Sequence, residues 1–158
     1  MSTGIVQKEK SKQALRVFLS YTSSDKGNAQ KLRNILSGQH DLRIFTSEML
    51  SAGENWQSKL RDEISQCDVF IALLSPKSVE SGWVLSELGA AWALEKKIVP
   101  VFTQPDVLSD IPVKLKDNQS FEFKSLEDRP ETLINLMKIM VSKKMAEDSL
   151  DDYDELSK

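Results

Sequence analysis

The chain reads SGWVLSELGAAWAL from Ser81 to Leu94 and continues, after three charged residues, with IVPVF from Ile98 to Phe102. The first run has the length and composition of a helix, and the second has those of a strand. Glu87 is the only charged residue between Glu80 and Glu95. In a helix, the residues three and four positions away from Glu87 are all apolar, and the opposite face is apolar as well. The sequence therefore predicts a buried helix that carries one carboxylate in an apolar face.

The carboxylate of Glu87 needs an explanation, because burying an unpaired charge is costly. Two explanations stay open at this point. Glu87 could turn to solvent or pair with a cation such as Lys26 or Arg16. Alternatively, it could line a cleft and take part in chemistry there.

Strand and helix patterns alternate along the rest of the chain. Strands are expected at 15–21, 42–45, 67–74, 98–102 and 121–123, and helices around 29–36, 56–64, 81–94 and 131–145. Such alternation implies a parallel sheet with helices on both faces. The nearly continuous apolar run at 67–74 is typical of a central strand. Ligands of these sheets bind at the carboxyl ends of the strands, which here carry Ser20, Tyr21, Thr22, Phe45 and Ser75.

Length and composition indicate one domain, since the chain has 158 residues of which 40% are hydrophobic. We expect a flexible N-terminal segment at 1–13, the folded domain at 14–145 and a disordered acidic tail at 146–158. A net charge of −3 argues against nucleic acid or a membrane surface as a partner. The chain has no secretory signal, no long apolar run and a single cysteine, so we expect a cytoplasmic location.

Several common sites do not fit the sequence. It contains neither a GxxxxGK[ST] P-loop nor a GxGxxG dinucleotide motif. One histidine, His40, and one cysteine, Cys67, are too few for a zinc site of nitrogen and sulfur ligands. A Ser-His-Asp triad would have to use His40, which follows a helix in a polar turn. A phosphoacceptor receiver domain needs an aspartate where the third strand here ends in Leu74-Ser75-Pro76.

The order of the motifs resembles a TIR (Toll/interleukin-1 receptor) domain over about residues 14–145. The matching segments are Val17–Tyr21 with Asp25, Gly53–Trp56, Cys67–Ser75 and Ser81–Leu88. They are most similar to the bacterial, NAD-cleaving branch of the family. The resemblance implies a flavodoxin-like three-layer α/β sandwich, with a five-stranded parallel sheet in the order 2-1-3-4-5 and helices on both faces.

Many TIR domains of bacteria and plants cleave NAD+, and their catalytic glutamate lies four residues after a tryptophan. This spacing maps the catalytic residue onto Glu87 and the aromatic residue onto Trp83. The resemblance thus implies an NAD+ nucleosidase (glycohydrolase or cyclase) that releases nicotinamide and linear or cyclic ADP-ribose in immune, anti-phage defence or signalling. NAD+ would be the substrate, no cofactor or metal is expected, and other TIR domains would be partners in self-assembly. One carboxylate can suffice, because nicotinamide leaves as a neutral ring that needs no proton.

The candidate substrate-binding residues are Trp83, Ser20, Tyr21, Thr22, Arg43 and Phe45. Trp83 could stack on a flat ring or simply belong to the core. Ser20 and Thr22 could contact ribose or phosphate, although simple helix capping by Thr22 or Ser23 is the better explanation for each of them alone. Arg43 could bind a phosphate or lie on the solvent face.

Three other aromatic residues can be explained wholly or partly by packing. Phe45 could pack against nicotinamide or against the core. We expect Trp56 to anchor its helix and Trp92 to lie in the core.

Two other functions stay open. The chain could be a non-catalytic TIR adaptor that acts by TIR–TIR assembly. It could also be similar to a nucleoside deoxyribosyltransferase, because that family has a glutamate beside Leu-Gly after a strand, a turn and a helix start, as in Glu87-Leu88-Gly89.

Overall fold

The structure is a computed structural model that describes residues 14–39, 41–50, 55–111, 115 and 118–157. Three sets of sequence-based expectations lie outside these residues. They concern the N-terminal segment 1–13, His40, and residues 53–54 of the motif before Trp56.

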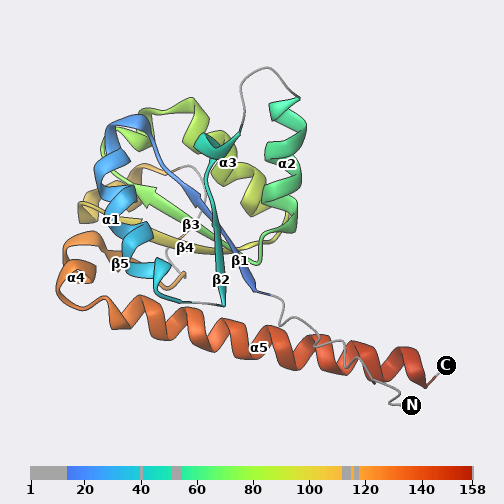
Figure 1. The fold of residues 1–158 in the computed structure, drawn as a ribbon. Coiled ribbons are helices and arrows are strands. Elements are labelled where there is room, and N and C mark those ends of the chain that lie inside the picture. The colour runs from blue at the N-terminus through green and yellow to red at the C-terminus, as the bar shows by residue number, and fades with distance from the viewer. Residues whose placement is uncertain (1–13, 40, 51–54, 112–114, 116–117, 158) are drawn as a thin grey trace, which may run out of the picture.

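Five strands form one parallel sheet in the order β2-β1-β3-β4-β5, which confirms the predicted order (Figure 1). The strands are β1 (Leu15–Ser20), β2 (Leu42–Phe45), β3 (Val69–Leu74), β4 (Lys97–Phe102) and β5 (Phe121–Glu122). All six residues of β3 are buried, as expected for a central strand whose sequence is apolar on both faces. In the parallel register, Phe18 of β1 lies beside Phe45 of β2 and Phe70 of β3.

Helices cover both faces of the sheet. The α-helices are α1 (Lys26–Ser37), α2 (Trp56–Gln66), α3 (Gly82–Ala93), α4 (Phe123–Asp128) and α5 (Glu131–Leu156), and the short 3-10 helices are η1 (Ser23–Asp25), η2 (Ser47–Met49), η3 (Ser78–Glu80) and η4 (Pro105–Asp110). Apolar side chains of α1, α4 and α5 form one core cluster with Val17 and Leu19, and those of α2 and α3 form the other with Phe18 and Phe70. The alternation of side chains along the strands therefore creates the three predicted layers.

The last helix is longer than the sequence indicated. We expected it to end at Met145 before a disordered tail, but α5 continues to Leu156, and its last turns extend beyond the rest of the domain (Figure 1). Residues 146–156 are all exposed, so packing does not hold them. They contain alanine, leucine and glutamate and no glycine or proline that would end the helix. Within the described ranges, no helix is long and apolar enough to span a membrane.

The outer side of α3 also differs from the expectation. Val84, Leu88 and Ala91 are buried against the sheet, whereas the side chain of Trp92 is 57% exposed. The expectation that Trp92 lies in the core is therefore wrong. In a three-layer sandwich, the sheet covers a helix from one side only, so an apolar residue on the other side stays exposed unless another element covers it.

A tight turn ends α3 and ties it to α2. Glu95 has a positive φ of 55°, its N–H donates to the carbonyl of Trp92 at 3.1 Å, and the N–H of Lys96 donates to that of Ala91 at 2.9 Å. This is the Schellman pattern, in which the residue with positive φ is usually glycine. The ammonium group of Lys96 donates to the carbonyl oxygens of Ser65 and Cys67, at the end of α2. The turn thereby fixes the distance between the two helices.

Replacing Glu95 by glycine should stabilise the protein, because glycine adopts a positive φ without the steric cost of a Cβ atom. We expect Glu95→Gly to raise the free energy of unfolding by about 0.5–1 kcal/mol, measured by urea denaturation. Glu95→Ala is the matched control, since it removes the same side chain but keeps the Cβ atom. A glycine variant no more stable than the alanine variant would contradict this account of the turn.

Candidate active site

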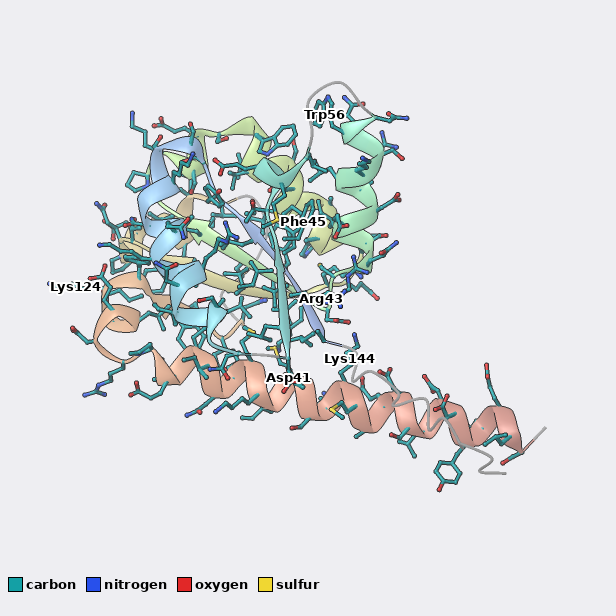
Figure 2. All side chains as sticks on the ribbon, in the orientation of Figure 1. Asp41, Arg43, Phe45, Trp56, Lys124 and Lys144 are labelled. Carbon is teal, nitrogen blue, oxygen red and sulfur yellow. The ribbon has the colours of Figure 1, made fainter. Side chains whose placement is uncertain are left out.

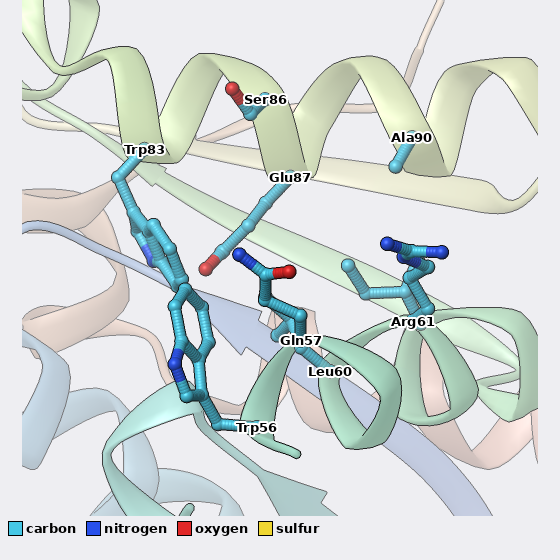
Figure 3. A pocket seen from close by; sticks show the side chains of 9 residues that line it. Trp56, Gln57, Leu60, Arg61, Trp83, Ser86, Glu87 and Ala90 are labelled. Atoms are coloured by element: carbon cyan, nitrogen blue, oxygen red, sulfur yellow. The ribbon is translucent and has the colours of Figure 1, made fainter. Parts of the chain in front are cut away.

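A cleft of about 290 Å³ lies between α2 and α3 on one face of the sheet (Figure 3). Its lining residues are Trp56, Gln57, Leu60, Arg61 and Ile64 from α2, and Trp83, Ser86, Glu87 and Ala90 from α3. These residues recur every three or four positions along each helix, so each helix presents one continuous face to the cleft. The cleft is the space between two helices that run side by side.

Contacts at both ends of the cleft connect its two walls. At the amino ends of the helices, the indole rings of Trp56 and Trp83 lie 5.1 Å apart at an angle of 38°. At the carboxyl ends, Lys96 bridges to the backbone of α2, with its Nζ 3.1 Å from the carbonyl oxygen of Cys67. The hydroxyl of Ser81 accepts a hydrogen bond from the N–H of Val84 and so caps the start of α3. These contacts fix the positions of the two helices that form the walls of the cleft.

Glu87 extends its side chain from α3 into this cleft, with Trp83 on one side and Gln57 facing it (Figure 3). Its side chain is only 3% exposed, yet neither carboxylate oxygen has a hydrogen-bond partner among the residues that the structure describes. Arg16, one suggested partner, instead pairs with Glu63 at 3.0 Å. Lys26, the other, lies exposed at the start of α1. Of the two explanations left open, the structure supports the cleft.

A second unpaired polar group lies near this carboxylate. The hydroxyl of Ser20, at the carboxyl end of β1, is fully buried and has no hydrogen-bond partner in the described part of the chain. Buried polar groups in proteins are nearly always satisfied. Two unsatisfied groups close together are therefore available to bind a polar ligand.

Burial raises the pKa of Glu87 from about 4.5 to about 7. The Ser20 hydroxyl and the Trp83 indole N–H lower this pKa somewhat, since they lie near enough to interact with the charge. Neither interaction has the geometry of a hydrogen bond, because both carboxylate oxygens remain without a partner within described residues. We therefore attribute the shift to loss of water around the carboxylate.

Thr22 belongs to a polar network that closes the carboxyl edge of the sheet. Its hydroxyl donates to the carboxylate of Asp25 at 3.1 Å, and the hydroxyl of Ser75 donates to the same oxygen at 2.5 Å. The Ser78 hydroxyl donates to the carbonyl oxygen of Ser75. This network joins the end of β1 to the end of β3. The hydroxyl of Thr22 makes no capping bond to the backbone of η1.

Tyr21 is also buried at this edge. Burial, together with the neighbouring Glu48, raises the pKa of Tyr21 to about 12. Its phenol therefore stays protonated at neutral pH and can donate a hydrogen bond. Tyr21 does not line the cleft that contains Glu87.

Arg43 and Phe45 lie on β2 (Figure 2). They line a separate hollow, together with Arg16 and Glu63. Phe45 packs on Phe18 with ring centroids 5.6 Å apart. The structure does not bring either residue to the cleft of Glu87. Of the candidate residues, it brings together Glu87, Trp83 and Ser20.

The contribution of α2 to the cleft was not predicted from the sequence. Trp56 does more than anchor its helix, since it is 37% exposed and pairs with Trp83 at the cleft mouth. Gln57 and Arg61 were not singled out, because a polar residue on the exposed side of an amphipathic helix looks like any solvated residue. No group of three or more His, Cys, Asp or Glu residues that could hold a metal occurs in the ranges that the structure describes.

Comparisons with known proteins agree on the fold. A sequence model of the TIR domain matches residues 17–137. The TIR domain of the Toll-related receptor TRR-2 from Hydra magnipapillata is 17% identical, with a TM-score of 0.62 over 78% of this chain and 96% of that one. The TIR domains of the activated Roq1 resistosome, which recognises the pathogen effector XopQ, are 21% identical, with a TM-score of 0.52 over 82% of each chain.

A 2-desoxiribosyltransferase from Leishmania mexicana is 23% identical, with a TM-score of 0.46 over 56% of this chain and 65% of that one. This last likeness is too weak to support an argument. No curated protein matches the sequence.

The raised pKa of Glu87 predicts a specific pH dependence of stability. The folded protein holds a proton on Glu87 up to pH about 7, while the unfolded chain releases it near pH 4.5. Wild-type stability should therefore fall, relative to Glu87→Gln, as the pH rises from 4.5 to 7. The difference should level off at about 3 kcal/mol above pH 7.

Urea denaturation of both proteins between pH 4 and 8 measures this difference. Glu80→Gln, which removes an exposed carboxylate near the start of α3, is the control and should follow the wild type in parallel. If the Glu87→Gln curve also stays parallel to the wild type, Glu87 is not a desolvated carboxylate.

Proposed function

The chain belongs to the TIR domain family, and on that premise we propose that it is an NAD+ glycohydrolase or cyclase of the bacterial, NAD-cleaving branch. The protein would break the bond between nicotinamide and ribose. The observation that carries this proposal is Glu87, a buried carboxylate without a partner among described residues, which faces an aromatic-lined cleft.

The cleft suits the nicotinamide end of NAD+. Trp83 and Trp56 offer indole faces at its mouth, and a positively charged pyridinium ring is attracted to such faces. The Glu87 carboxylate adds a negative charge next to them. A volume of about 290 Å³ is just below the usual range for ligand pockets, roughly 300–1,000 Å³. The nicotinamide and its ribose would therefore fill the cleft, and the rest of the dinucleotide would lie outside.

Glu87 would act on the ribose. Its two oxygens can accept hydrogen bonds from the two ribose hydroxyls, and the Ser20 hydroxyl can complete this contact. As the bond to nicotinamide breaks, its electron pair leaves with the ring and the ribose becomes cationic. A fixed carboxylate in a water-poor cleft stabilises that charge more strongly than water does. Attack by water on C1 then gives ADP-ribose and one proton, and attack by a nucleophile within the same molecule gives a cyclic product.

The substrate itself would bring Glu87 into the reactive state. In the free protein, burial raises the pKa of Glu87 to about 7, so protonated and ionised forms coexist near neutral pH. A positive pyridinium nearby favours the ionised carboxylate and lowers its pKa. Binding of NAD+ would thus release the proton and form the ion pair that the transition state needs.

The proposal extends to a cytoplasmic role in immune, anti-phage defence or signalling, with other TIR domains as partners in self-assembly. Membership of the family supports this role. The solved Roq1 resistosome, in which TIR domains form part of an assembly that recognises a pathogen effector, also supports it.

Release of nicotinamide from NAD+, followed by chromatography at high protein concentration, tests the proposed activity. We expect the wild type to release nicotinamide and Glu87→Gln to lose about 10²–10³-fold in kcat, because one fixed electrostatic group is removed from the transition state. Glu80→Gln is the matched control and should keep full activity, since this acid is exposed outside the cleft.

Three outcomes would contradict the proposal. One is an unchanged rate in the Glu87→Gln variant. Another is a wild type that assembles but neither binds nor cleaves NAD+, which would favour the adaptor. The third is base exchange with deoxynucleosides and none with NAD+, which would favour the deoxyribosyltransferase-like alternative.

A further inference from the structure

We propose that Arg61 binds the diphosphate of the substrate and makes the site selective for phosphorylated nicotinamide compounds over the plain riboside. This inference rests on the proposed function, since it names the part of NAD+ that a second residue of the same cleft would recognise. It replaces Arg43, the phosphate-binding candidate from the sequence.

The order of residues along the cleft places Arg61 beyond Glu87, as seen from the tryptophan pair. Both helices have their amino ends at the Trp56–Trp83 pair. Going along α2 from this pair, Gln57 comes first, facing Glu87, and Arg61 follows one turn later on the same side (Figure 3). Four residues of helix correspond to about 6 Å.

The order of groups in NAD+ is the same. Nicotinamide is attached to C1 of its ribose, the hydroxyls that Glu87 would bind are on C2 and C3, and the diphosphate is attached through C5, beyond C4. With the pyridinium at the two indole rings and the ribose at Glu87, the diphosphate lies on the far side of the sugar. Arg61 occupies that position along the cleft.

Charge supports the same assignment. Among the described residues that line the cleft, Arg61 is the only cation, and the chain as a whole is acidic with a net charge of −3. No carboxylate within the described ranges pairs with Arg61. Its guanidinium group has a planar array of donors that matches two phosphate oxygens at once, which a lysine cannot provide.

The size of the cleft explains why this cation can be exposed. A volume of about 290 Å³ leaves the diphosphate outside the enclosed part, at the rim, and the Arg61 side chain is exposed there. Arg43, by contrast, lies in the hollow beside β2 with Arg16 and Glu63. A substrate held by Glu87 would not reach both hollows with one diphosphate.

Three substrates test the inference, namely NAD+, nicotinamide mononucleotide and nicotinamide riboside, because only the first two carry phosphate. We expect Arg61→Gln to lower kcat/KM for NAD+ by about 10–100-fold, mainly through KM, since a charge-assisted hydrogen bond to phosphate is lost. The kcat/KM for the mononucleotide should also fall, whereas the kcat/KM for the riboside should change by less than about threefold. Arg61→Lys should recover only part of the loss.

Two further variants sharpen the comparison. Arg129→Gln removes an exposed arginine after α4, on the opposite face of the sheet, and should behave as the wild type. Arg43→Gln tests the sequence-based alternative, and a larger loss there than in Arg61→Gln would overturn the inference. An equal loss on NAD+ and riboside would overturn it as well, because Arg61 would then act on something other than phosphate.

A binding measurement separates this inference from the proposed function. ADP-ribose carries the diphosphate but no nicotinamide, and its binding can be followed by the change in tryptophan fluorescence, to which Trp56 and Trp83 at the cleft mouth contribute. If the wild type releases no nicotinamide, the proposed function fails, and ADP-ribose still decides about Arg61. Weaker binding in Arg61→Gln supports the inference. Equal affinity, or no binding to the wild type, overturns it.

Discussion

The burial of Glu87 without a partner among described residues is the constraint on which the other features of this domain depend. A carboxylate in this state disfavours folding, so the rest of α3 has to compensate. Val84, Leu88 and Ala91 do so by packing on the sheet, and the cap at Ser81 secures the helix start. The Trp56–Trp83 contact and the Lys96 bridge to the end of α2 join the two helices at both ends of the cleft. Glu87 lies between these two contacts, in the cleft.

This arrangement is typical of a site in which stability is exchanged for function. Ser20 and Glu87 lack the partners that buried polar groups normally have within the described chain. A ligand with two hydroxyls and a positive ring would supply hydrogen-bond partners for Ser20 and Glu87 and a positive charge beside the carboxylate. Relief of the unsatisfied groups would then contribute to binding, and the remaining negative charge would act when the sugar becomes cationic. One carboxylate thus explains an unfavourable feature of the free protein and carries the proposed catalytic role.

The sequence predicted most of the fold and two residues of the candidate site, Trp83 and Glu87, for physical reasons that can be stated. The run around Glu87 has one charge among apolar residues, so its burial follows from helical spacing, and the apolar run of β3 fixes the middle of the sheet. The contribution of α2 was not predictable in this way. Arg61 lines a cleft only because α3 packs beside α2, and no pattern in the local sequence of α2 predicts that packing. Local pattern also misjudged Trp92, whose exposure depends on what covers α3, and the end of α5, which no packing contact determines.

The most direct test of the central claim is a crystal structure of the Glu87→Gln variant with NAD+ bound. The account predicts that the nicotinamide lies against Trp83 and Trp56 and that the hydroxyls of its ribose are within hydrogen-bond distance of residue 87. NAD+ bound elsewhere on the domain, or in the cleft with its adenine end at residue 87, would contradict it.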